Sequence, residues 1–335
     1  MKRCLIIIGV LFSIAIGYFL VFNFNNKLVA KLKSTELHDS AWVAPSLFLD
    51  VTTQGEERKL VIYGQELIAH TAKYFGPNGL LTKTTNGMNC QNCHLSAGTK
   101  PWGNNFGAVY STYPKYRARS GTKESIYKRI FDCMERSLNG KGIDSSSREF
   151  KAIYAYIKWL GANAPDSNVM KSIGIEKLPY LNRAANPITG KKIYTSQCSN
   201  CHGDNGEGVL DAIKMEYVYP PLWGPNSYND GAGLYRLSNF AGFVKNNMPY
   251  LKASHQSPLL TNEAAWDVAA FVNSQSRPHK NQMNDWPVLK EKPIDYPFEP
   301  FFDKFPASQH KFGPYLPIQG FYQQMKNDKS SIHYK

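Results

Sequence analysis

Apolar residues recur at three- and four-residue spacing in several segments of the chain, which is the pattern of helices with one buried face. In the first such segment, Leu60, Leu67 and Ile68 share a face, and Gly76-Pro77 ends the pattern. The predicted helices are Glu56–Phe75, Lys123–Leu138, Arg148–Leu160, Pro187–Gln197 and Glu263–Ser274. Loops rich in Gly, Tyr and Pro separate them, so we expect a mainly α fold.

Residues at the predicted helix ends agree with this assignment. Thr122 is the expected N-cap of the second helix, Ser145–Ser147 offer one for the third, and Gly161 ends the third. Thr261 or Asn262 is expected to cap the last helix.

The N-terminus reads as an export signal. Residues 4–22 form an almost unbroken apolar run after Lys2 and Arg3, which predicts a signal peptide or signal anchor over residues 1–25. The run approaches the roughly 20 residues that span a bilayer, and no convincing cleavage site follows it. We therefore expect a periplasmic protein with an uncleaved anchor, a cleaved signal being the alternative. A polar lead segment, 26–54, follows.

Two copies of one motif carry the strongest chemical signal. The form Cys-x-x-Cys-His, which attaches c-type haem, occurs at residues 90–94 and 198–202. Two thiols three residues apart reach both vinyl groups of one porphyrin, while the adjacent histidine becomes an axial ligand of the iron. The chain is thus predicted to bind two covalently attached haem c groups. The attachment residues are Cys90, Cys93, His94, Cys198, Cys201 and His202.

The spacing of the motifs predicts two class I cytochrome c-like haem domains in tandem, because a porphyrin fills much of the core of a small domain. The expected divisions are domain 1 at 55–165, a linker at 166–185 and domain 2 at 186–276. A C-terminal tail, 277–335, is predicted to wrap over both domains without periodic structure, and its last ten residues are predicted to be disordered.

The remaining cysteine and the net charge limit the classes of ligand and partner that the chain is expected to bind. Of six cysteines, four attach haem and Cys4 lies in the signal segment, which leaves Cys133 without a disulfide partner. The formal net charge of +13 favours anionic small molecules, acidic redox partners, nucleic acid or an anionic membrane. Export and haem argue against nucleic acid, and membrane contact is expected only through the N-terminal anchor.

The second axial ligand of each iron decides its redox role. For the second haem, Met248 is favoured because it precedes a proline on a loop before the last helix, although a packed loop methionine is the ordinary alternative. Lys245 and Lys252 are weaker candidates, since a lysine must lose its proton to bind iron.

For the first haem the candidates are Cys133, Met134 and His70. A lone helical cysteine is more often a small buried hydrophobic residue than a ligand. Cys133 is nevertheless favoured, because it lacks a disulfide partner, follows His94 at nearly the offset of Met248 in domain 2, and lies among basic residues. A thiolate ligand lowers the potential and methionine raises it, so a low-potential and a high-potential haem are expected.

At this point the sequence resembles a known family. The segments 89–99 and 129–140, the second containing Cys133, are similar to those of dihaem thiosulfate dehydrogenases, and domain 1 also resembles the haem subunit of the Sox thiosulfate-oxidising complex. The similarity runs from about residue 55 to 280. It implies a His/Cys-ligated active-site haem in domain 1 and an electron-transfer haem, ligated by His202 and Met248, in domain 2.

By position, the resemblance also implies that Arg119, Arg129 and Ser137 line the substrate pocket beside Cys133. Some family members carry a lysine immediately before the ligand methionine and exchange the two ligands. Here that residue is Asn247, which puts such an exchange in doubt.

The implied activity joins two thiosulfate dianions into tetrathionate with release of two electrons, or the reverse. Arginines near Cys133 suit this chemistry, because guanidinium groups neutralise the repulsion and donate paired hydrogen bonds to sulfonate oxygens. We expect Arg119 and Arg129 to bind substrate, and Arg117 and Arg136 to be solvated surface residues. The expected electron partner is a small cytochrome c or another periplasmic carrier.

Two other functions stay open at this stage: a membrane-tethered dihaem electron carrier without its own substrate, and a dihaem peroxidase. Neither assigns a role to Cys133 and the arginines around it. The direction of the reaction depends on the haem potentials, which the sequence does not contain.

Overall fold

The computed structural model describes residues 42–48, 53–162 and 172–332, with side chains described up to residue 327. The predicted signal or anchor segment lies outside these residues, as do most of the predicted lead segment and parts of the predicted linker and of the last ten residues. None of the helices within the described ranges is both long and apolar enough to cross a bilayer.

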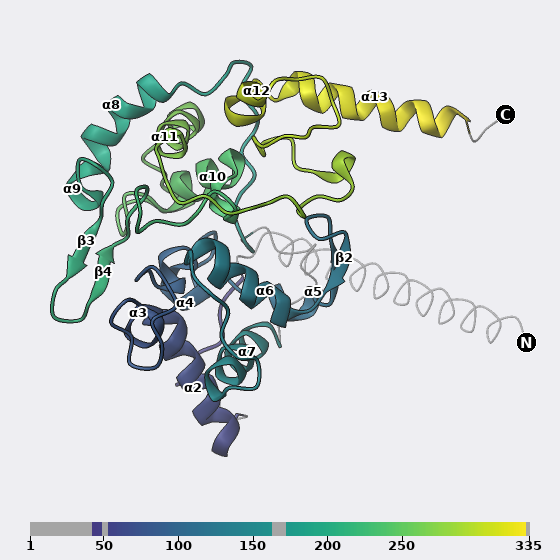
Figure 1. Cartoon of the computed structure of the whole chain (residues 1–335). Coiled ribbons are helices and arrows are strands. Elements are labelled where there is room, and N and C mark those ends of the chain that lie inside the picture. The colour runs from purple at the N-terminus through teal and green to yellow at the C-terminus, as the bar shows by residue number, and fades with distance from the viewer. Residues whose placement is uncertain (1–41, 49–52, 163–171, 333–335) are drawn as a thin grey trace, which may run out of the picture.

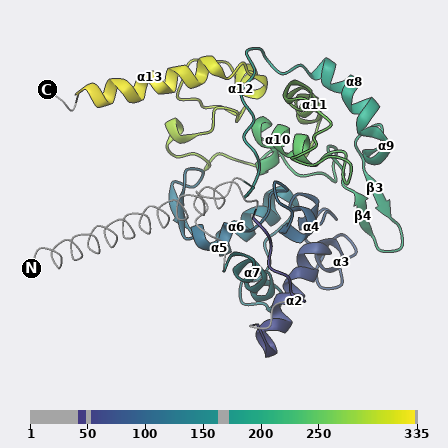
Figure 2. The same ribbon diagram turned by 180° about the vertical axis from the view of Figure 1, so that it is seen from behind.

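The described chain forms two mainly helical lobes, one below the other in Figure 1 and again in the reverse view of Figure 2. The lower lobe contains α2 (Gly55–Ala69), α3 (Thr71–Phe75), η1 (Cys90–Asn92), α4 (Leu95–Gly98), α5 (Val109–Thr112), β1 (Lys115–Arg117), β2 (Thr122–Glu124), α6 (Ile126–Asp132), the π-helix η2 (Cys133–Ser137) and α7 (Arg148–Gly161). The two strands form one antiparallel pair, and the other regular elements of the lobe are helices joined by loops.

The upper lobe repeats the plan of a helix, a haem motif and a closing helix. It contains α8 (Pro187–Gln197), α9 (Ser199–His202), β3 (Val209–Asp211), β4 (Glu216–Tyr219), η3 (Gly233–Tyr235), α10 (Leu237–Asn247) and α11 (Asn262–Ser274). The C-terminal segment adds η4 (Leu289–Glu291), α12 (Ala307–Phe312) and α13 (Leu316–Ile332) beside it, on the right in Figure 1. The predicted mainly α class is therefore confirmed.

In each lobe the first and last helices cross at a glycine. A Cβ atom at Gly64 of α2 would lie 2.0 Å from the carbonyl oxygen of Ala152 in α7. A Cβ atom at Gly190 of α8 would lie 1.9 Å from the carbonyl oxygen of Asp267 in α11. Any larger residue would hold the helices apart, so these glycines permit the backbone contact that closes each lobe.

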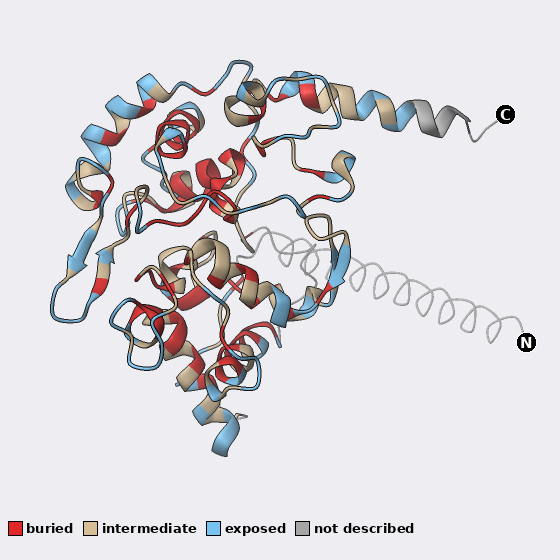
Figure 3. Cartoon of the chain, in the orientation of Figure 1, coloured by how far each residue is buried: buried red, intermediate tan, exposed pale blue. Residues whose placement is uncertain are grey.

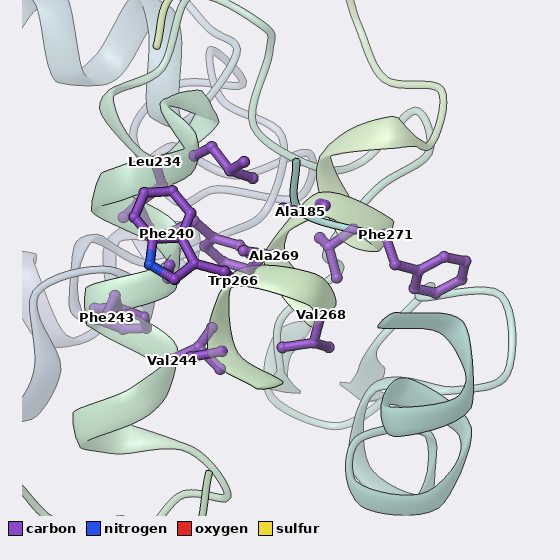
Figure 4. Packing of buried hydrophobic residues seen from close by; sticks show 14 of the residues in the cluster. Ala185, Leu234, Phe240, Phe243, Val244, Trp266, Val268, Ala269 and Phe271 are labelled. Atoms are coloured by element: carbon purple, nitrogen blue, oxygen red, sulfur yellow. The ribbon is translucent and has the colours of Figure 1, made fainter. Parts of the chain in front are cut away.

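Each lobe has its own apolar core, seen as the buried segments inside both lobes in Figure 3. In the upper lobe, Trp266 and Val268 of α11 pack with Phe240 and Phe243 of α10 (Figure 4). Tyr315 and Ile318, from the C-terminal segment, are fully enclosed in the same cluster. The C-terminal segment therefore completes the core of the upper lobe.

The same segment also reaches the lower lobe. The backbone N–H of Trp286 donates to the carbonyl oxygen of Arg119 at 2.7 Å. Tyr116 donates to Glu291 at 2.7 Å, and Asp285 accepts from Arg136. The segment thus links the two lobes.

Several predicted elements differ from the structure. The helix expected from Lys123 begins at Ile126, because residues 122–124 pair with β1 and Ser125 is the N-cap that accepts from the Lys128 amide. The helix expected over 56–75 is interrupted at His70. α10, α12 and α13 were not predicted. The period of α10 is present in the sequence as Leu237, Phe240 and Val244 but was missed, whereas α12 is only six residues long and α13 contains Pro and Gly in its first turns.

Candidate functional site

The first haem motif begins on the short 3₁₀ helix η1, continues through its C-cap Cys93 and ends at His94. The Nδ1 of His94 donates to the carbonyl oxygen of Asn104 at 2.6 Å, which leaves Nε2 as the free ligand atom. Burial lowers the pKa of His94 to about 4, so the ring stays neutral, as a metal ligand must be. The ring of Phe106 packs 4.4 Å from the imidazole and holds its orientation.

A cavity of about 320 Å³ lies beside this histidine. Cys90 and His94 line it, and Cys133 and Met134 line it from η2. His70, the third candidate ligand, is not among the lining residues; its Nδ1 lies 3.0 Å from a carboxylate oxygen of Glu216 instead. Two of the three candidates are therefore placed at the cavity.

The second motif has the same arrangement. The Nδ1 of His202 donates to the carbonyl oxygen of Pro220 at 2.9 Å, and burial lowers the pKa of His202. A cavity of about 530 Å³ is lined by this histidine, by the thiols of Cys198 and Cys201, and by Met248 directly after α10.

The residues near Met248 include the two lysines that were alternative candidates for the iron ligand. Lys252 also lines the cavity, whereas the Nζ of Lys245 donates to the side-chain oxygen of Asn262 at 2.5 Å. Asn247 is fully buried and donates to the carbonyl oxygens of Trp102 at 3.0 Å and Phe243 at 2.9 Å. The position before Met248 thus carries a hydrogen-bonded link to the lower lobe.

Both cavities fit a covalently attached haem. The second cavity offers both cysteines of its motif, and the first offers Cys90. Each also offers a neutral imidazole with a free Nε2 and a volume within the range of about 300–1,000 Å³ typical of cofactor pockets. Cys93 is the exception among the lining thiols, because it faces the second cavity although it belongs to the first motif. The two haem sites therefore lie close to each other across the lobe boundary.

A smaller cavity of about 80 Å³ lies at that boundary, next to the first haem site. Residues of both lobes line it, and its character is cationic. Its lining includes Cys133, Ser137, Arg119, Arg129, Arg136, Gly231, Asn239 and one carboxylate, that of Asp132. Because its three guanidinium groups outnumber the single carboxylate, the pocket suits a small anion.

The two predicted substrate-binding arginines have different environments. Arg119 has a side chain only 13% exposed, and its Nη1 donates to the carbonyl oxygen of Gly231 at 2.7 Å. Burial lowers the pKa of its guanidinium. The pKa of Arg129 is raised, mainly by its electrostatic interaction with the neighbouring Cys133 and against the effect of burial. Both groups are cationic at neutral pH, since arginine titrates far above it.

The structure brings Cys133 to one cavity with Arg119, Arg129 and Ser137, the residues that the resemblance implied; their roles stay a prediction. The expectation that Arg136 is a solvated surface residue is wrong. Its side chain is 11% exposed and makes paired hydrogen bonds of 2.9 and 2.8 Å to Asp285. No local pattern could reveal this, because the partner lies 149 residues away.

Comparisons of the sequence with family models and with known proteins agree with one another. The family model of the SoxA/TsdA cytochrome c domain matches residues 81–165, and the cytochrome c family model matches residues 188–276. A thiosulfate dehydrogenase of Stutzerimonas stutzeri is 34% identical over 234 residues, covering 70% of this chain and 73% of the relative. A thiosulfate dehydrogenase of Allochromatium vinosum is 40% identical over 197 residues, covering 58% of this chain and 71% of the relative.

A solved structure agrees with these relatives. The thiosulfate dehydrogenase TsdBA of Marichromatium purpuratum, in its as-isolated form, has a TM-score of 0.65 and 31% identity. The match covers 73% of this chain and 51% of that chain, so this protein spans about half the length of the solved one. The chain belongs to the thiosulfate dehydrogenase family and is a c-type cytochrome with two covalently bound haems.

Proposed function

We propose that this protein interconverts thiosulfate and tetrathionate, with substrate in the cationic cavity and electrons passing through the second haem to a carrier. The observation that carries the proposal is the cavity itself: Arg119, Arg129 and Ser137 meet Cys133 in a space of about 80 Å³. An electron carrier without a substrate would leave this cluster without a role. The names of the relatives support the same reaction class.

The arginines address the main electrostatic obstacle. Two thiosulfate dianions repel each other strongly in a low-dielectric pocket, and cationic donors at the site offset that repulsion. The guanidinium of Arg119 is held in place by Gly231, and Arg129 lies beside Cys133. Ser137 adds a hydroxyl that donates to or accepts from a sulfonate oxygen.

Joining two thiosulfates forms one sulfur–sulfur bond and releases two electrons; the reverse reaction consumes them. A c-type haem accepts one electron at a time, so two haems together supply the required capacity. Cys133 and His94 would hold the haem iron in domain 1, and Met248 and His202 would hold it in domain 2, since each pair lines a single cavity. Thiolate and thioether donors then separate the two potentials.

We further propose that the protein acts in the periplasm and exchanges electrons with a small cytochrome c. The basis is the apolar N-terminal run after Lys2 and Arg3, together with the two covalent haem motifs. We include in this proposal that the run remains as a membrane anchor. The run lies outside the described residues.

The test uses the haem-loaded protein under argon. Thiosulfate is added to the oxidised form and tetrathionate to the reduced form while the haem α-band is followed. Cys133→Ala should abolish the response in both directions with both haems still attached. Met134→Leu is the matched control, because Met134 lines the same cavity one position along, and it should retain the response.

The outcomes separate the alternatives. Absence of a response in the unmodified protein, with normal electron exchange with a small cytochrome, would refute the proposal in favour of a simple carrier. Full activity of Cys133→Ala would remove Cys133 from the mechanism, and loss of activity in Met134→Leu alone would transfer the ligand role to Met134.

A further inference from the structure

Arg136 lies at the cationic cavity but is absent from the set predicted to bind substrate. It lines the cavity from η2 with Arg129 and Ser137. Its Nη1 and Nη2 donate to the two carboxylate oxygens of Asp285 at 2.9 and 2.8 Å. Because both terminal nitrogens are held by one carboxylate, the plane of the guanidinium is fixed.

One donor of this side chain stays unused. Among the described residues, no acceptor lies within hydrogen-bonding distance of the Nε of Arg136, although this atom is buried. An unpaired buried N–H carries the full penalty of its lost hydration. A ligand oxygen that approached Nε from the cavity, which Arg136 lines, would remove that penalty, so the unused donor is an argument for an occupant.

Asp285 contacts Arg119 and Arg136 but is not part of the cavity lining. Besides its paired bonds to Arg136, its carboxylate lies 3.7 Å from Nη1 of Arg119. Without it, two guanidinium groups would repel each other at the same edge of the cavity. The next residue, Trp286, is tied to Arg119 through its backbone N–H and lies with its ring 5.3 Å from that guanidinium.

We propose that Arg136 is a third substrate-binding arginine, whose Nε donates to a sulfonate oxygen, and that Asp285 is the positioning residue that holds it. The inference rests on the proposed function and extends it in two ways. It specifies the ligand as a tetrahedral sulfur oxyanion that accepts a hydrogen bond from Arg136 of η2. It also makes the segment after the second haem domain part of the substrate site.

The experiment measures anion binding and turnover in the haem-loaded full chain. Calorimetry with sulfate, a redox-inert tetrahedral dianion, gives the affinity of the oxidised protein. Thiosulfate oxidation gives KM and kcat. Arg136→Lys keeps the positive charge but removes Nε and the planar fork, and Asp285→Asn removes the charge that orients it.

The matched control is Asp267→Asn. Asp267 accepts paired bonds of 2.8 and 2.9 Å from Arg183 and lies in α11, away from the cavity lining. It therefore forms the same paired arginine–carboxylate geometry without the proposed role, with a buried carboxylate but an arginine side chain that is 48% exposed. A second variant, Asp285→Glu, keeps the carboxylate and should recover part of the loss.

We expect Arg136→Lys and Asp285→Asn each to weaken sulfate binding and raise KM about tenfold, which corresponds to about 1.4 kcal/mol. kcat should change by less than about threefold, since the residues bind and do not transfer electrons. Asp267→Asn should stay within twofold in all three quantities. In the double variant the losses should not add, because both act through one guanidinium.

The inference is overturned if Arg136→Lys leaves sulfate affinity and KM within twofold, or if Asp267→Asn shifts them equally. Binding that tightens in Asp285→Asn would show that this carboxylate competes with the anion and would remove its positioning role. Absence of turnover in the unmodified protein would refute the proposed function alone, because sulfate calorimetry still decides whether Arg136 binds an oxyanion.

Discussion

The glycine at the crossing of α2 and α7 gives the sharpest test of the fold. In Gly64→Ala, the new Cβ would lie 2.0 Å from the Ala152 carbonyl oxygen and 2.7 Å from the Cβ of Tyr156, whereas ordinary contacts begin at 3.4 Å. The obstacle is backbone, so the helices must separate by on the order of 1 Å, and such overpacking costs about 3 kcal/mol.

The gain in helix propensity on replacing glycine by alanine returns at most about 1 kcal/mol. The expected net loss of stability is about 2 kcal/mol, and the expected fall in the unfolding midpoint is roughly 8 °C for domains of this size. The midpoint is followed by far-UV circular dichroism of the haem-loaded protein. Gly190→Ala should behave similarly in the upper lobe, where the contact distance is 1.9 Å.

The control is Gly320→Ala in α13. A Cβ atom there has nothing within 4 Å, so the midpoint should stay unchanged or rise by about 2 °C. A midpoint of Gly64→Ala within 1 °C of the unmodified protein would refute the close helix crossing. An equal fall in Gly320→Ala would show that the loss has another origin.

Two further predictions concern the upper lobe. Met248→Ala should lower the potential of one haem in a redox titration, because a thioether ligand raises that potential. Met283→Ala, which changes an exposed methionine, is the control and should leave both potentials unchanged. Equal potentials in the two variants and the unmodified protein would show that Met248 does not bind the iron. Asp295 is buried, and burial raises its pKa. Arg236 and Ser238 together lower the pKa by more than burial raises it, so the net pKa lies below the ordinary value. Its stabilisation should be present above about pH 4 and disappear as the pH falls through the lowered pKa. Asp295→Asn should therefore cost about 3 kcal/mol at pH 7, measured by urea unfolding, and the difference from the unmodified protein should shrink at pH 3; a constant difference would contradict this.

Local sequence rules were reliable where one turn of chain decides the outcome. Ser147 accepts from the Phe150 amide and Thr261 from the Ala264 amide, as the N-cap predictions required. The prediction of Thr122 as a cap is wrong, because that residue pairs in a strand with Arg117. Pairing between segments competes with local capping, and the local pattern contains no information about the partner.

By itself the sequence determined the two covalent haem groups and the mainly helical architecture. Both depend on short-range chemistry: a thiol pair and a histidine must lie within one turn to hold one porphyrin, and apolar spacing decides which helix face is buried. The tertiary structure alone decided how the arginines are used. Arg136 is a buried, oriented group only because Asp285 arrives from a segment 149 residues later, and the energy of a charge depends on what surrounds it after folding.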